Sequence, residues 1–169
     1  MKFSPVPQYS FRDITDISPD FLSRLGVRFL MLDLDNTIAA YGESSLSGDI
    51  ARWAAVMKKN RVELFIVSNN RRKGRVEAFA QALEIGFIKA AWKPSPNGVL
   101  KAMETARFTA HESALAGDQV FADALAANRA GAFSIVVRPR SFRSPLLAIR
   151  YALESPFRAF CKNKHVPIE

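Results

Sequence analysis

The alternation of short apolar runs with helical stretches is the feature that most restricts the fold of this chain. The first run, residues 27–32, is apolar at nearly every position, as expected for a strand buried on both faces of a parallel sheet. Strand and helix patterns alternate five times with short connections, which predicts an α/β fold with one parallel five-stranded sheet and helices on both of its faces. The predicted strands are residues 27–32, 62–67, 86–88, 113–116 and 133–137.

Capping residues and apolar periodicity locate the helices between these strands. Side chains at three- and four-residue spacing form one apolar face on each of the two longer helices in the first half of the chain. These faces are Ile50, Trp53, Ala54 and Met57, and then Val76, Phe79, Ala80 and Leu83. The predicted helix starts are Ser18-Pro19, Ser47, Asn70 and Ser95-Pro96, with Gly131 ending the helix that starts near Val120.

Two carboxylates, Asp33 and Asp35, follow the first buried strand and are followed by Asn36 and Thr37. Like charges this close repel each other, and they lie beside the most apolar stretch of the chain. A hard divalent cation is the usual means of holding such a pair together. Taken alone, the same residues could also form a helix cap or an Asx turn after a strand.

Conspicuous polar residues follow the other strands as well. Ser68 and Asn69 follow the second strand, Lys93 the third, and Asp118 and Asp123 the fourth. In an open α/β sheet, ligands bind beyond the carboxyl ends of the strands, so we expect these side chains to share one crevice with the first pair. The carboxylates offer oxygen ligands for Mg²⁺, and a lysine and a helix-start hydroxyl suit a phosphate. Because a carboxylate can attack phosphorus and a second can transfer protons, the set predicts metal-assisted phosphoryl transfer.

These motifs resemble those of the haloacid dehalogenase (HAD) superfamily of phosphohydrolases, in order and in position at strand ends. Residues 33–37 (DLDNT) match motif I, DxDx[TV]; Ser68 matches motif II and Lys93 motif III; residues 117–123 (GDQVFAD) match motif IV, GDxxxxD. Together they span residues 27–137, and the joint match is specific although each motif alone is weak.

The resemblance implies a role for each matching residue. Asp33 would be the nucleophile and Asp35 the general acid/base. Ser68, Asn69 and Lys93 would bind the transferring phosphoryl group. Mg²⁺ would be ligated by Asp33, by the backbone carbonyl of Asp35 and by Asp118. Thr37 would steady the loop, and Asp123 would support the metal site. Taken singly, Ser68 could instead be a helix cap and Lys93 a solvated surface lysine.

The spacing of the motifs leaves no room for the cap domains that many HAD enzymes use to choose substrates. A site without a cap suits a bulky substrate. Further motifs, among them residues 128–131 (NRAG) and Lys93-Pro94, resemble the YqeG-type, class IIIA HAD phosphatases, which are related to mitochondrial phosphatidylglycerophosphatases. This resemblance implies hydrolysis of phosphatidylglycerophosphate to phosphatidylglycerol. A phosphatase for a soluble sugar, nucleotide or protein phosphate is the alternative, and a non-catalytic RNA- or protein-binding module is a second one.

Composition limits the remaining possibilities. The chain has 169 residues and one cysteine, Cys161, which favours a reducing compartment. No apolar stretch approaches the roughly 18 residues of a membrane span, and the N-terminus lacks the apolar region of a signal peptide. We therefore expect a cytoplasmic protein. The predicted parts are an N-terminal extension (1–25), a catalytic domain (26–140) and a basic C-terminal tail (141–169).

The basic charge is concentrated in the tail. Of the formal net charge of +8, residues 138–169 contribute +5. Ser144-Pro145 could open a helix that Ser155-Pro156 breaks in two. Its apolar face would be Leu146, Ile149, Leu153, Phe157 and Phe160, flanked by Arg143, Arg150 and Arg158. Such a tail predicts either peripheral contact of residues 143–164 with an anionic membrane or a helix packed on the domain. Nucleic acid is a less favoured partner.

Overall fold

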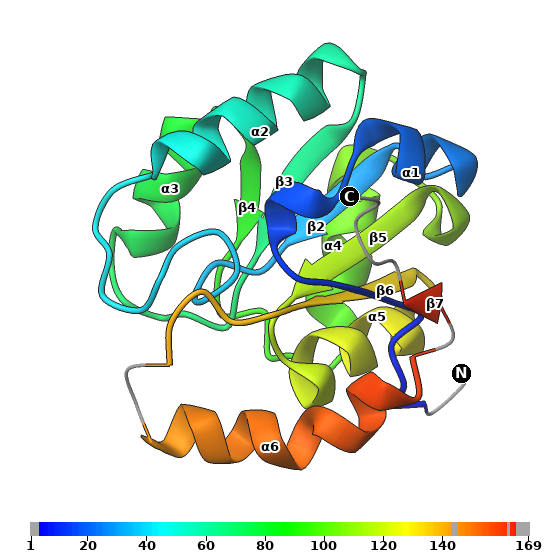
Figure 1. Cartoon of the computed structure of the whole chain (residues 1–169). Coiled ribbons are helices and arrows are strands. Elements are labelled where there is room, and N and C mark those ends of the chain that lie inside the picture. Colours follow the sequence, from blue (N-terminus) through cyan, green and yellow to red (C-terminus); the bar gives the residue numbers. More distant parts are fainter. Residues whose placement is uncertain (1–3, 143–144, 162, 165–169) are drawn as a thin grey trace.

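The computed structural model describes residues 4–142, 145–161 and 163–164. Its centre is a seven-stranded sheet in the order β4-β3-β2-β5-β6-β1-β7, and every neighbouring pair is parallel. Figure 1 shows the strands and the helices that cover them. The strands are β1 (Tyr9–Phe11), β2 (Phe29–Leu32), β3 (Glu63–Val67), β4 (Gly86–Ile88), β5 (Ser113–Gly117), β6 (Phe133–Val137) and β7 (Asn163–Lys164).

All five predicted strands are present, but the predicted strand number was too low. The two additional strands, β1 and β7, come from the flanks of the chain and extend the sheet beyond β6. They have three and two residues, too short for an alternating or continuous apolar run to stand out in the sequence. Their pairing with β6 and with each other identifies them, and that pairing exists only in the folded chain.

Helices cover both faces of the sheet, as predicted. α1 (Pro19–Arg24), α2 (Gly48–Lys59) and α3 (Arg75–Leu83) share one apolar core with one side of the sheet, and α4 (Asn97–Ala106) and α5 (Leu125–Ala130) share a second core with the other. Alternate residues of β2 contribute to each: Leu30 and Leu32 to the first core, Phe29 and Met31 to the second. Burial on both faces is the reason that this strand reads as a continuous apolar run.

The helix faces agree with the sequence better than the helix starts do. All eight predicted inward residues of α2 and α3 are buried. Ser18 caps α1 by accepting a hydrogen bond from the Phe21 N–H at 3.1 Å. The prediction that Asn70 caps the next helix was wrong: α3 begins at Arg75 after Gly74, whose φ is 80°. The Asn70 side chain instead accepts from the Arg72 N–H at 2.7 Å, an Asx turn that competes with capping.

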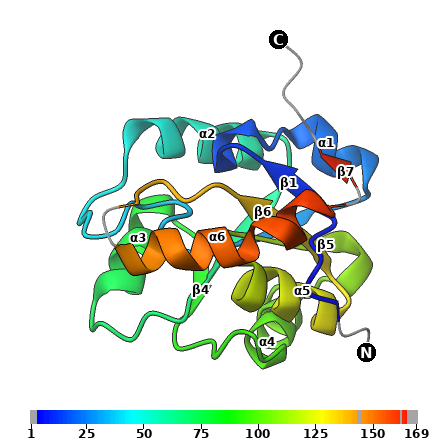
Figure 2. The ribbon, with the colours of Figure 1, turned by 60° about the horizontal axis from the view of Figure 1, so that its bottom comes forward.

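The last helix, α6 (Pro145–Ala159), continues through Pro156, so the predicted break was wrong. Three short helical segments, η1 (Ile14–Asp16), η2 (Ala110–Glu112) and η3 (Val120–Ala124), complete the fold. α6 packs against η3, where Phe157 contacts the small cluster of Val120, Ala124 and Val136; Figure 2 shows α6 from its outer side. Ser144, Arg143 and Lys162 lie outside the described residues. Among the described helices, none has the length and apolar character that a membrane crossing requires.

The flanks are continuous with the central core. Phe11, Ile14, Phe21 and Leu22 are buried in the same cluster as β2 and α2. The division of the chain at residues 25 and 140 stays a prediction about folding units, but both flanks add strands to the one sheet.

Candidate active site

The predicted site residues lie at the carboxyl ends of three adjacent central strands. Asp33 follows β2, Ser68 follows β3 and Asp118 follows β5, while Lys93 lies between β4 and α4. Because β2 pairs with both β3 and β5, residues that are 35 to 85 positions apart in the chain end at one edge of the sheet. The structure thus brings the four motifs together.

Lys93 joins two of the carboxylates. Its Nζ is 2.7 Å from Asp33 Oδ1 and 2.6 Å from Asp123 Oδ1, and it donates to the Val67 carbonyl at 2.6 Å. The side chain is 1% exposed. Burial by itself would lower the pKa of this ammonium, but the carboxylates of Asp123 and Asp33 outweigh burial and raise the pKa. Lys93 is therefore a fixed, fully charged cation and not a solvated surface lysine.

The carboxylates of the site are held away from water. Burial raises the pKa of Asp33 to about 7, because the attraction of Lys93 only partly offsets the loss of hydration and the repulsion of Asp123 and Asp35. Burial, together with the charges of Asp33 and Asp123, also raises the pKa of Asp118. The three acids contact two cations, Lys93 and Arg150, so one negative charge is left over that a bound cation would neutralise.

The arrangement fits a divalent metal ion. Asp33, Asp118 and Asp123 each present a carboxylate oxygen within 4.8 Å of the others, and all three residues are buried. Among the described residues, Asp118 Oδ1 has no hydrogen-bond partner although it is buried, and a buried acceptor without a donor is costly unless a cation binds it. Asp123 packs directly on Gly117, where an added Cβ would lie 2.2 Å from the Asp123 carboxyl carbon. Only glycine permits this approach.

Asp35 is held by partners that the motif analysis missed. Asn70 Nδ2 donates to Asp35 Oδ2 at 2.6 Å, and Arg75 donates to Asp35 Oδ1 from Nε at 3.0 Å and from Nη2 at 2.8 Å. Arg75 also donates to the Glu43 carbonyl, which ties the loop after β2 to α3. The basic start of the helix after SNN was visible in the sequence, but the direction of its side chains was not.

The two residues after β3 have different surroundings. Ser68 is buried, and its hydroxyl accepts from the Asn70 N–H at 3.1 Å. The side chain of Asn69 makes a reciprocal pair with the main chain of Lys93, with both bonds at 2.8 Å. Asn69 thus fixes the segment that carries Lys93, and its role as a phosphate ligand stays a prediction, as does that of Ser68.

The loop after β2 is closed by its own backbone. Asn36 has a left-handed φ of 65°, its N–H donates to the Ala39 carbonyl at 2.7 Å, and its own carbonyl accepts from the Arg140 N–H at 3.0 Å. Thr37 is fully buried, and its hydroxyl has no partner among the described residues. The contacts that hold this loop come from Asn36. A supporting role for Thr37 stays a prediction.

Comparison with known proteins agrees with this geometry. The family model described as haloacid dehalogenase-like hydrolase matches residues 10–131. This chain belongs to that family. A curated relative, "Probable phosphatase YqeG" of Bacillus subtilis (strain 168), is 31% identical over 134 residues, which are 79% of this chain and 77% of the relative. The chain is therefore a HAD-type phosphatase.

Solved structures show the same fold at low sequence identity. An uncharacterised protein from Listeria monocytogenes serotype 4b has a TM-score of 0.57 at 15% identity, over 79% of this chain and 99% of that one. The cobalt-bound deoxy-D-mannose-octulosonate 8-phosphate phosphatase from Haemophilus influenzae has a TM-score of 0.56 at 15% identity, over 82% and 90%. HAD phosphatases use a divalent metal, and the acidic triad of this chain could bind one.

As expected for a HAD enzyme without a cap domain, only short elements separate the motifs. Between Thr37 and Ser68 the chain forms one loop, α2 and β3, and between Asn70 and Lys93 it forms a loop, α3 and β4. All of these residues are described. The carboxyl edge of the sheet is therefore not covered by an inserted domain in either interval.

Two arginines of α6 reach the site, although no sequence motif pointed to them as site residues. Arg150 Nη2 donates to Asp118 Oδ2 at 2.8 Å, and Arg158 donates to the Asp118 carbonyl and, at 3.0 Å, to the Val137 carbonyl. The sequence predicted that both arginines flank the apolar face of this helix and left open whether the helix packs on the domain; their contacts with Asp118 show that α6 packs on the domain. Periodicity locates a face of a helix, but it does not tell which face packs inward when a buried acid offers an ion pair.

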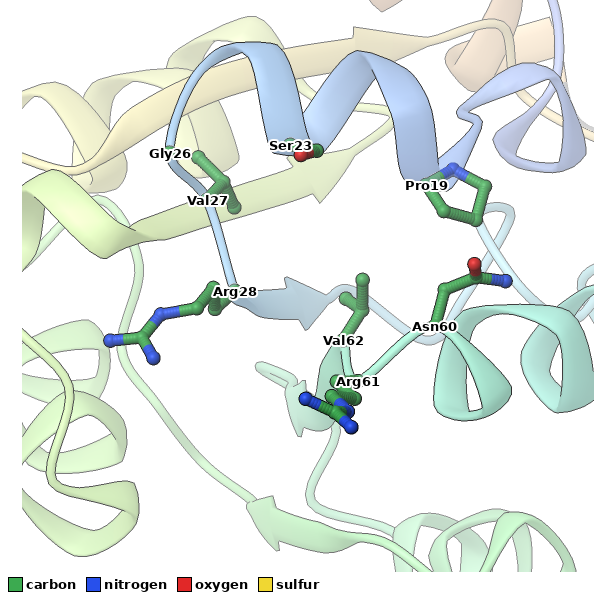
Figure 3. Close-up of a pocket in the computed structure, with 8 residues that line it drawn as sticks. All are labelled: Pro19, Ser23, Gly26, Val27, Arg28, Asn60, Arg61 and Val62. Atoms are coloured by element: carbon green, nitrogen blue, oxygen red, sulfur yellow. The ribbon is translucent and has the colours of Figure 1, made fainter.

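The cavity shown in Figure 3 is not part of this site. It has a volume of about 360 Å³ and is lined by residues that precede β2 and β3, among them Val27, Arg28 and Val62. The strands begin there and end at the site, so the cavity lies at the opposite edge of the sheet.

Proposed function

We propose that the protein is a Mg²⁺-dependent phosphomonoester hydrolase that acts through an aspartyl-phosphate on Asp33. The observation that carries this proposal is the buried contact of Lys93 with both Asp33 and Asp123. Beside it, Oδ1 of Asp118 has no hydrogen-bond partner within the described part of the chain. Lys93 holds Asp33 by one oxygen, which leaves the other for attack. Buried charges are paired or coordinate metals, and of these three buried acids only Asp33 and Asp123 contact Lys93.

Each catalytic residue has a step in this proposal. The free oxygen of Asp33 forms a bond to phosphorus as the ester oxygen leaves, and Asp35 gives that oxygen its proton. Asp35 then takes a proton from the water that attacks the phosphoryl group and restores Asp33. Ser68 donates its hydroxyl to a phosphoryl oxygen, and Lys93, whose three N–H groups contact Asp33, Asp123 and the Val67 carbonyl, contributes its positive charge beside the phosphoryl group. A bound Mg²⁺ would neutralise charge on the phosphoryl group, held by Asp33, Asp118 and the Asp35 carbonyl, with Asp123 in support.

For the substrate we propose phosphatidylglycerophosphate, converted to phosphatidylglycerol at the cytoplasmic face of a membrane. Two features support a lipid: the site without a cap, and the outward face of α6. The exposed positions of α6 are apolar apart from Ser155, whereas Arg150, Glu154 and Arg158 face inward. An exposed apolar patch of this kind marks an interaction surface. We therefore propose peripheral membrane contact through residues 143–164.

Phosphate release from phosphatidylglycerophosphate in mixed micelles tests both the phosphatase mechanism and the lipid substrate. The purified protein with Mg²⁺ should release phosphate, and Asp33→Asn, which keeps the size of the side chain, should lose at least about a thousandfold of the rate. Turnover of a soluble phosphate ester without turnover of the lipid would refute the lipid substrate and leave the phosphatase. No Asp33-dependent turnover of any phosphomonoester would refute the phosphatase mechanism.

A soluble phosphate ester is the second candidate. The observation that favours it is the likeness in fold to a protein named for its action on deoxy-D-mannose-octulosonate 8-phosphate, a sugar phosphate. A panel of sugar, nucleotide and phosphopeptide substrates, compared with the lipid at equal concentration, separates the two candidates by kcat/KM. We propose that the lipid gives the higher value.

A further inference from the structure

Arg150 connects α6 to the candidate metal site. It lies on a helix that none of the four motifs includes, and its Nη2 donates to Asp118 Oδ2 at 2.8 Å. Asp118 is fully buried, while the Arg150 side chain is 31% exposed. The contact uses one oxygen of Asp118, and the second, Oδ1, is buried and has no hydrogen-bond partner among the described residues. One side of the carboxylate is therefore anchored and the other is available.

We infer that Arg150 is a positioning residue for the metal site, which holds Asp118 by Oδ2 so that Oδ1 is directed at the cation. Carboxylates that ligate metals are themselves hydrogen-bonded, and such outer partners fix the orientation of the ligand. This inference rests on the proposed metal-dependent function. It adds α6 to the catalytic centre of a protein whose motifs end with the segment before β6.

The rest of α6 is held so that Arg150 can reach Asp118. Arg158 donates to the carbonyls of Asp118 and Val137 and, at 3.2 Å, to Glu154 Oε2. Glu154 is 1% exposed and accepts from the Phe121 N–H at 3.4 Å. These buried polar contacts set the register of the helix against η3. The polar side of α6 thus faces the metal site, where Arg150 orients a ligand, and the apolar side is exposed.

The contact of Arg150 with Asp118 Oδ2 leaves Oδ1 for a cation, so the arginine and the cation do not compete for the same oxygen. Arginine–carboxylate pairs are frequently bidentate, whereas Arg150 engages a single oxygen of Asp118. The two oxygens of one carboxylate can serve an arginine and a metal together. Removal of Arg150 would let Asp118 rotate and would weaken metal binding, whereas removal of a competitor would strengthen it.

Calorimetric titration of the metal-free, full-length protein with MgCl₂ tests the inference without any substrate. We expect Arg150→Gln to raise the Kd for Mg²⁺ roughly 10- to 100-fold and Arg150→Lys, which restores the charge with a shorter reach, to recover part of the loss. Phe157→Ala is the matched control: it removes a packing contact of α6 with Phe121 but does not touch Asp118, and we expect its Kd to remain within about twofold of wild type.

The outcomes separate this inference from the proposed function. An unchanged or lower Kd in Arg150→Gln would refute the inference, and so would an equal loss in Phe157→Ala, which would make the effect one of helix docking alone. If wild type binds Mg²⁺ and Arg150→Gln binds it more weakly, but no phosphomonoester is hydrolysed, the inference is supported and the proposed function is not.

Discussion

At the scale of single residues, the site is an arrangement of buried charges around Lys93. Three acids and one lysine are removed from water together, which costs free energy unless each charge has a partner. Lys93 supplies one partner for Asp33 and Asp123. Asp118 receives Arg150 on one oxygen only. The loss of a residue near the chemistry should therefore change stability as well as activity.

Replacement of Lys93 by Met should remove activity and lower the free energy of unfolding by about 3 kcal/mol at pH 8, because two buried carboxylates lose their cation. At pH 5 the loss should be smaller, since Asp33 can then bind a proton. Urea denaturation of the metal-free protein at both pH values measures this. Lys59→Met, at an exposed position of α2, is the control, and wild-type stability of Lys93→Met at pH 8 would contradict the interpretation.

The raised pKa values of Asp33 and Asp118 predict a pH dependence of stability. The folded, metal-free protein holds protons that the unfolded chain releases near pH 4, so its free energy of unfolding should fall as the pH rises from about 4 to about 7. Asp33→Asn should fall less over the same range. Thermal unfolding between pH 5 and 8 shows the difference, and saturating Mg²⁺ should abolish it. If stability depended on pH in the same way in wild type and in Asp33→Asn, the raised pKa of Asp33 would be contradicted.

At the scale of elements, α6 is unusual because its polar side faces the protein. Leu146, Ile149 and Leu153 are 75%, 58% and 66% exposed, and Glu154 is almost completely buried. An ordinary surface helix has the reverse orientation. The buried ion pairs near Asp118 explain the inward side, and a lipid surface would explain the outward side. The same helix then links the place where a substrate arrives with the place where the metal binds.

Leu153→Glu should weaken binding to phosphatidylglycerol vesicles roughly tenfold, because one apolar side chain no longer enters the interface and a negative charge is added. The free energy of unfolding should change by less than about 0.5 kcal/mol, since the position is exposed. Co-sedimentation with vesicles measures the first quantity. Val56→Glu, at an exposed position of α2, should bind like wild type, and equal binding by both variants would argue against the membrane contact.

At the scale of the whole molecule, the two ends of the chain complete one sheet. β1 lies between β6 and β7. Phe11 of β1, together with Ile14 and Phe21 of the segment that follows, is buried in the main core. Arg140, beyond β6, donates to Asp49 Oδ2 on α2 at 2.6 Å and holds the loop of Asn36. The sheet edge that carries the site is thus stabilised by segments that contain no motif.

Phe11→Ala should lower the free energy of unfolding by about 3 to 5 kcal/mol, as expected when a buried aromatic ring is lost from a core. Chemical denaturation should still show one transition, because the N-terminal residues share the core of the central domain. Arg12→Ala, at the neighbouring exposed position, should be close to wild type. Two separate transitions, or no effect of Phe11→Ala, would instead indicate an N-terminal segment that is independent of the core.

The sequence alone predicted the central fold, the resemblance to the family and the candidate residues of the site. Strands buried on both faces are apolar throughout, so β2 to β6 could be predicted from local patterns. Parallel strands have their carboxyl ends at one edge of the sheet, so Asp33, Ser68, Lys93 and Asp118 could be predicted to lie there.

The tertiary structure alone decided the partners of these residues. Asn70 and Arg75 on Asp35, and Arg150 on Asp118, depend on side-chain direction between elements that are distant in the chain. Strand β1 depends on pairing with β6, and β7 depends on pairing with β1. The orientation of α6 depends on a buried acid 32 residues before Arg150. Local patterns show which helix and strand faces can be buried. Which of these faces is buried depends on the packing of the whole chain, because the chain adopts the arrangement of lowest free energy.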